Sequence, residues 1–248
     1  MRADQIGLQL YTVRAMTGAD MIGTLRQLAQ IGYRAVEFAG FGNSTAQEIK
    51  PVLDELGMTT IAAHISIGDW ENALAQVFAD LHTLGAQYAV VPWLAPELRT
   101  PAYLGSLLDK LHRWGAASRA EGLTLAYHNH DFEFAAGADG TFFDSLLART
   151  DPDLVKLELD VYWVQYAGYD PVEILRANPG RVPLLHVKDM AADGKDMAVA
   201  GDGILPWDHI LRAAEDGGTE WFIVEHDRPA DALSDVARAL RYLESRLS

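Results

Sequence analysis

Eight short apolar segments recur along the 248-residue chain, and stretches with helical periodicity lie between them. The segments span residues 6–12, 33–40, 58–66, 86–93, 123–130, 154–163, 182–189 and 221–227. Strands that alternate with helices at intervals of about 30 residues pair in parallel through right-handed crossovers. Eight such units in a chain of this length predict an α/β protein with one (β/α)8 TIM barrel domain over residues 1–248.

Helix ends fit the same pattern. Helical periodicity covers residues 21–32, 45–57, 70–85, 104–122 and 231–247. Four of these stretches end in a glycine just ahead of the next apolar segment, at Gly32, Gly57, Gly85 and Gly122, where a left-handed C-terminal cap turns the chain back. A doubly wound open sheet is the main alternative, but its usual glycine-rich turn does not follow the first segment, "IGLQLYT".

Composition excludes several classes of function. The chain has no cysteine, which rules out disulfides, a thiol nucleophile and thiolate metal sites. Its net charge of −15, with no basic cluster, argues against nucleic acid and anionic lipid as partners. The opening "MRADQIGLQLYTVR" does not read as a signal peptide, and no segment reaches the roughly 20 apolar residues of a membrane span. We expect a cytoplasmic protein with a small-molecule partner; a homo-oligomer stays open.

Polar side chains gather where the predicted strands end. In a parallel barrel the active site lies at the carboxyl ends of the strands, so these residues are the first candidates. They are Gln9 and Tyr11, Glu37, His64, Trp93, His128 and His130, Asp160, His186 with Lys188, and Glu225 with Asp227.

Strand parity brings four of these residues together. Side chains alternate across a strand, and this rule sends His128, Asp160, His186 and Glu225 into the barrel from four successive strands. Because neighbouring strands are less than about 5 Å apart, the four can surround one point. Two imidazoles and two carboxylates suit Mn²⁺, Co²⁺, Fe²⁺ or Zn²⁺, and suit Mg²⁺ less well. The alternative is that these groups only hydrogen-bond across the barrel mouth.

An ordered set of motifs resembles a known superfamily over nearly the full chain. The motifs are "IGLQLYTVR", "GYRAVEFAG", "AAHIS", "LAYHNHDFEF", "LELDVYWV", "HVKDM", "GDGILPW" and "VEHD". They resemble the xylose-isomerase-like TIM barrels, divalent-metal sugar isomerases, epimerases and related dehydratases. The resemblance implies a carbohydrate substrate and a bound metal. In the ketose epimerases of that superfamily, the metal is held by Glu, Asp, His and Glu, which map onto His128, Asp160, His186 and Glu225.

The first of these positions departs from the epimerases, whose two glutamates face each other across the substrate. A metal-bound imidazole cannot readily exchange a proton as well, because its lone pair is committed to the metal. We therefore expect Glu225 to remove the α-proton and His130, His64, Glu133 or Lys188 to supply the second acid or base. The activity predicted first is a sugar or sugar phosphate isomerase or epimerase acting on a ketose through an enediolate. The alternatives are a dehydratase or lyase of a keto-sugar or keto-cyclitol, and a non-catalytic carbohydrate-binding barrel.

The remaining candidates concern substrate contacts. Glu37 either binds substrate hydroxyls or pairs with Arg14, and Glu158, just below Asp160, is expected to pair with Lys156. His64 and Lys188 are expected to contact substrate because each lies at the mouth. The aromatic residues that either stack on a sugar face or simply pack at the rim are Tyr11, Trp93 and Trp163.

Overall fold

Eight parallel strands close into a barrel. The computed structural model describes residues 1–137 and 140–247. The barrel strands are β1 (Ile6–Gln9), β2 (Ala35–Phe38), β3 (Thr59–His64), β4 (Tyr88–Val91), β5 (Thr124–His128), β8 (Val155–Asp160), β9 (Leu184–Val187) and β12 (Trp221–Val224). They follow chain order around the barrel, and β12 pairs with β1 to close it. The predicted (β/α)8 fold is confirmed.

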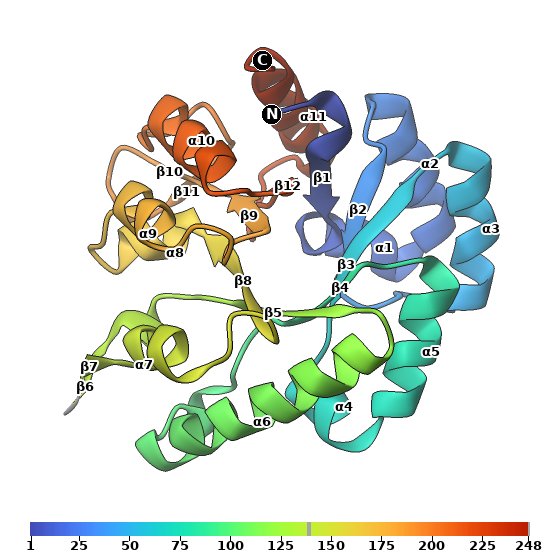
Figure 1. Cartoon of the computed structure of the whole chain (residues 1–248). Helices are drawn as coiled ribbons and strands as arrows, with labels where there is room; N and C mark the ends of the chain where they lie inside the picture. The colour runs from blue at the N-terminus through green and yellow to red at the C-terminus, as the bar shows by residue number, and fades with distance from the viewer. Residues whose placement is uncertain (138–139, 248) are drawn as a thin grey trace.

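Helices surround the strands on the outside (Figure 1). The longer ones are α2 (Met21–Ile31), α3 (Ala46–Leu56), α5 (Leu74–Leu84), α6 (Pro101–Ala120), α7 (Phe142–Arg149), α9 (Pro171–Ala177), α10 (Trp207–Asp216) and α11 (Ala232–Glu244). Gly57 and Gly85 end α3 and α5 in the left-handed conformation, as the sequence predicts. One expectation is wrong: the helix expected over residues 70–85 is two helices, because Ala73 leaves helical geometry between α4 (Ile67–Asn72) and α5.

Short elements follow the carboxyl ends of β1, β5, β8 and β9. Helix α1 (Arg14–Ala19) follows β1 after a 3-10 turn, and α8 (Val161–Tyr166) directly follows β8. β6 (Ala136–Gly137) pairs antiparallel with β7 (Gly140–Thr141), and β10 (Asp189–Met190) pairs antiparallel with β11 (Met197–Ala198). Within residues 1–137 and 140–247, no helix has both the length and the apolar character needed to cross a membrane.

The interior of the barrel is divided into an apolar half and a polar half. Side chains in the half nearer the amino ends of the strands form a small apolar cluster: Ala35, Ile61, Ala62, Tyr88, Val90, Ala126, Leu184 and Ile223. Two residues further along three of these strands stand His128, His186 and Glu225, all buried. The apolar half therefore supports a layer of ionisable groups that faces the mouth.

Candidate metal and acid–base site

Four side chains converge at the carboxyl ends of β5, β8, β9 and β12. His128, Asp160, His186 and Glu225 each offer a ligand atom, and these atoms lie within 4.8 Å of one another. All four residues are buried. These are the four residues that strand parity brings together in the sequence.

Asp160 is oriented by the helix that it begins. It is the last residue of β8 and the N-cap of α8, and its Oδ1 accepts hydrogen bonds from the backbone N–H groups of Tyr162 and Trp163. Because Oδ1 is engaged in the cap, Oδ2 turns toward the cluster, 3.9 Å from His128 Nε2. Burial raises the pKa of Asp160 to about 6. One residue thus both ends a strand and presents an oxygen to the site.

The ammonium group of Lys188 lies against the same carboxylates. Its Nζ is 2.7 Å from Glu225, 2.8 Å from Asp227 and 3.0 Å from Asp160, and the side chain is almost fully buried. Burial lowers the pKa of Lys188, but these three carboxylates outweigh this effect and raise the pKa well above its usual value. Burial raises the pKa of Glu225, but the positive charges of Lys188 and His186 outweigh this effect and hold the pKa well below its usual value. Lys188 is therefore a protonated group and Glu225 an ionised one.

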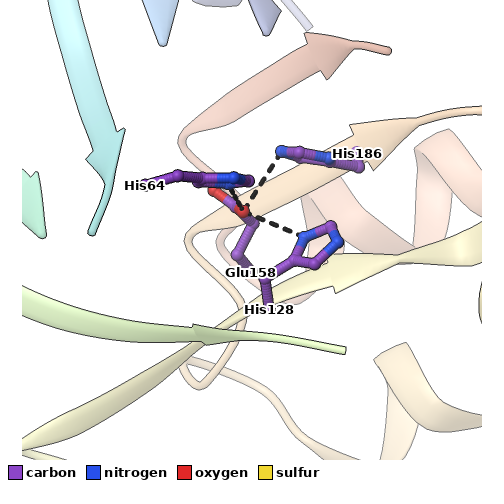
Figure 2. A group of neighbouring side chains, drawn as sticks. All are labelled: His64, His128, Glu158 and His186. Atoms are coloured by element: carbon purple, nitrogen blue, oxygen red, sulfur yellow. Dashed lines mark hydrogen bonds and ion pairs between the residues drawn. The ribbon is translucent and has the colours of Figure 1, made fainter. Parts of the chain in front are cut away.

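A second cluster lies beneath the first, and we call it the floor: Glu37, His64 and Glu158. Glu158 Oε2 is approached by nitrogens of three histidines, His64, His128 and His186, as Figure 2 shows. Glu37 Oε2 lies 2.9 Å from His186 Nε2, and Glu37 Oε1 lies 3.4 Å from His64 Nε2. The two glutamates are fully buried. Buried carboxylates of this kind persist only where they are paired and hydrogen-bonded.

The floor corrects two expectations from the sequence. Glu158 does not pair with Lys156, whose ammonium donates instead to the carbonyl of Gly180. Glu37 does not pair with Arg14, whose guanidinium donates to the carbonyl of Tyr11. Both glutamates are named from the sequence, but the imidazoles that they contact are not predicted from it.

The three imidazoles next to the floor differ in charge. Although burial lowers it, Glu37 and Glu158 raise the pKa of His64 to about 10. Burial lowers the pKa of His128 to about 4. Although burial lowers it, Glu158 and Glu225 raise the pKa of His186 well above its usual value. Without a bound cation, His64 and His186 are therefore protonated at neutral pH and His128 is neutral.

His130 and Trp163 lie on one side of the mouth. The His130 ring is 4.9 Å from that of His128 and 5.3 Å from that of Trp163, and Lys188 Nζ lies 5.7 Å from the Trp163 ring centre. Burial, with the positive charge of Lys188, keeps the pKa of His130 well below its usual value. Its Nδ1 has no hydrogen-bond partner within the described residues. His130 is thus a neutral imidazole beside a protonated lysine.

The other aromatic candidates lie at the rim. Tyr11 is 41% exposed and Trp93 is 47% exposed, whereas Trp163 is half-buried. Arg14 stacks on Tyr11, and Arg99 lies 5.5 Å from the Trp93 ring centre. The exposed rings of Tyr11 and Trp93 are available to a ligand. Within the described residues, neither ring contacts the cluster of ionisable groups at the strand ends.

The donor set fits a divalent cation. His128, Asp160, His186 and Glu225 supply two nitrogens and two oxygens without sulfur, a combination that Mn²⁺, Co²⁺, Fe²⁺ and Zn²⁺ accept. Asp160 Oδ2 lies 3.0 Å from Lys188 Nζ and 3.9 Å from His128 Nε2. The ligand atoms of the four residues lie within 4.8 Å of one another, so that one cation could contact all of them.

Comparison with known proteins places the chain in a family. The model of a family described as xylose isomerase-like TIM barrel matches residues 25–246. The chain belongs to the xylose isomerase-like TIM barrel family. The resemblance seen in the ordered motifs is confirmed by this match and by the closed barrel.

Relatives within this family carry two kinds of name. A protein of Geobacillus kaustophilus named inosose dehydratase is 27% identical over 245 residues, covering 82% of this chain and 79% of that protein. A Clostridium beijerinckii protein of the same name is 22% identical over 263 residues, covering 89% and 87%. A solved structure described as a sugar phosphate isomerase/epimerase from Parabacteroides distasonis is 26% identical, with a TM-score of 0.80, and covers 97% of this chain and 93% of that one.

Proposed function

We propose that this chain is a divalent-metal-dependent dehydratase that acts on a keto-cyclitol or a closely related keto-sugar. The observation that carries the proposal is a pair of unlike groups next to the Trp163 ring: His130, whose buried Nδ1 has no hydrogen-bond partner within the described residues, and Lys188, whose ammonium faces three carboxylates. Elimination of water requires one group that takes a proton and another that gives one. The similarity to proteins named inosose dehydratase supports the same activity.

The cation would be held by His128, Asp160, His186 and Glu225. When bound, it would polarise the substrate carbonyl and so acidify the adjacent C–H bond. The chain's own residues perform the proton transfers. We assign the base to His130 rather than to Glu225, because Glu225 is assigned to the cation and is already paired with Lys188 and His186, whereas Nδ1 of His130 has no hydrogen-bond partner within the described residues.

The elimination is balanced by two proton transfers. His130 takes the α-proton, the electron pair of that C–H bond forms the new carbon–carbon double bond, and the bond to the β-hydroxyl breaks. Lys188 gives its proton to the departing hydroxyl, which leaves as water. The half-buried ring of Trp163, next to both groups, limits the access of solvent to the reacting carbon.

An isomerase or epimerase, the activity predicted first, is supported only at the level of the family. A two-base epimerase needs matched groups on the two faces of one carbon, and His128 stands where the first glutamate would be. The structural similarity to the Parabacteroides protein keeps this activity as the second candidate.

The test is to incubate the protein with an inosose after loading it in turn with Mn²⁺, Co²⁺, Zn²⁺ and Mg²⁺. We expect the substrate to lose water. NMR in D2O and the absorbance of the unsaturated product monitor this loss. Lys188→Met should abolish elimination, and Lys50→Met, on the surface helix α3, is the matched control. Deuterium uptake with inversion or carbonyl migration, and no loss of water, would show an isomerase or epimerase instead.

A further inference from the structure

Glu158 takes no part in the proton transfers described above, yet it has the largest number of imidazole neighbours in the site. Its Oε2 lies 2.7 Å from His64 Nε2, 3.0 Å from His128 Nδ1 and 3.2 Å from His186 Nε2. Figure 2 shows the three rings directed at this one oxygen from β3, β5 and β9. The glutamate itself is fully buried on β8.

Two of these rings span the floor and the mouth. His128 directs Nδ1 to Glu158 and Nε2 toward Asp160 Oδ2, 3.9 Å away. His186 directs Nε2 to the floor, 2.9 Å from Glu37 Oε2, and Nδ1 to Glu225 Oε2, 2.8 Å away. A neutral imidazole carries its proton on only one of its two nitrogens, and the nitrogen without the proton is the one that can bind a metal.

We propose that Glu158, with Glu37, is a positioning residue that keeps the ring protons of His128 and His186 on the floor side. The lone pairs of His128 Nε2 and His186 Nδ1 then face the mouth, where a cation can use both. Glu158 faces Nδ1 of His128 at 3.0 Å, and Glu37 faces Nε2 of His186 at 2.9 Å. The inference rests on the metal site named under the proposed function.

A competing arrangement would make Glu158 a ligand. Ligand atoms of His64, His128, Glu158 and His186 also lie within 4.8 Å of one another. A cation there would need lone pairs on His128 Nδ1 and His186 Nε2, the opposite tautomers. The geometry argues against it, because His186 Nε2 faces two carboxylates, Glu37 and Glu158, whereas Nδ1 faces Glu225 alone, so the ring proton is better held on Nε2.

The experiment uses zinc, which is diamagnetic, and histidines labelled with 15N. Long-range 15N–1H NMR identifies the protonated nitrogen of each ring, first in the metal-free protein for His128 and then in the zinc-loaded protein for both rings. We expect protons on His128 Nδ1 and His186 Nε2. Glu158→Ala should give mixed tautomers of His128 and weaken zinc binding about 10- to 100-fold, measured by competition with a chelator. Glu158→Gln, which keeps one acceptor oxygen, should lie between the two.

Ile61→Val is the matched control, because it trims the barrel interior without removing a polar group. It should leave both the tautomers and the zinc affinity unchanged. Weaker zinc binding in Glu158→Ala with unchanged tautomers would show that Glu158 is itself a ligand, and unchanged binding would show that it positions nothing; either result overturns the inference. Retention of zinc by Asp160→Ala would overturn the metal site itself, and neither measurement depends on dehydratase turnover.

Discussion

The buried carboxyl group of Glu133 should make the protein less stable as the pH rises. Glu133 follows β5, is fully buried, and accepts hydrogen bonds from the Tyr127 hydroxyl and the backbone N–H of His130. Burial raises its pKa to about 8, in spite of these two hydrogen bonds. The pKa of Glu133 is about 4.5 in the unfolded chain and about 8 in the folded protein. Between these two pH values, the folded protein therefore holds a proton that the unfolded chain has lost.

The sign and size of the effect follow from this difference in bound protons. The contribution to stability is complete below about pH 4.5 and declines as the pH rises toward 8, by about 1.4 kcal/mol for each pH unit. Over the whole window the loss is about 4–5 kcal/mol. Glu133→Gln should remove this loss, because the amide is uncharged at every pH and can still accept the His130 N–H and donate to Tyr127.

Urea unfolding at pH 5, 6, 7 and 8 in the presence of a chelator measures the effect. As the pH rises, the unfolding free energy of the unaltered protein should fall relative to that of Glu133→Gln. Glu173→Gln, at an exposed position of α9, is the matched control and should show no such change. A difference that stays constant from pH 5 to pH 8 would refute the reasoning, because it would mean that Glu133 is ionised in the folded protein throughout.

Three further outcomes are expected. The double variant His186→Ala/Asp160→Ala should lose its metal, and full occupancy by elemental analysis would contradict the ligand set. Metal affinity should fall as the pH drops, because the proton on His186 competes with the cation and the pKa of this residue lies well above its usual value; a flat affinity from pH 7 to pH 5 would contradict this. His130→Ala should slow turnover by about 10²–10⁴-fold while metal stays bound, and loss of metal in this variant would mean that His130, not His128, is the ligand.

The fold could be predicted because its signals are local. Each strand is a short apolar segment, and glycines such as Gly57 and Gly85 mark the ends of helices with a left-handed residue. Counting these units is enough to indicate a barrel. The convergence of His128 and Asp160 was also predictable, since strand parity and the common direction of the strands place both at one end of the barrel.

The contacts of the floor could not be predicted from the same signals. Lys156 and Glu158 share a face of β8, but two residues along a strand separate them by about 6–7 Å. Imidazoles on neighbouring strands come closer to Glu158 than Lys156 does. Glu37 meets His186 only because the barrel closes, since β2 and β9 are separated by β1 and β12. Local sequence patterns do not predict the distances between side chains on strands that are not neighbours.

The position of His128 links the architecture to the proposed chemistry. A glutamate in the same place could bind a metal with one oxygen and still accept a proton on the other. An imidazole whose Nδ1 faces Glu158 and whose Nε2 faces the cation has no site left for a transferred proton. In the proposed mechanism, proton transfer therefore falls to His130 and Lys188, which differ in charge. Matched bases would return a proton to the same carbon, whereas a neutral base and a cationic acid are suited to removing a proton from one carbon and a hydroxyl from the next.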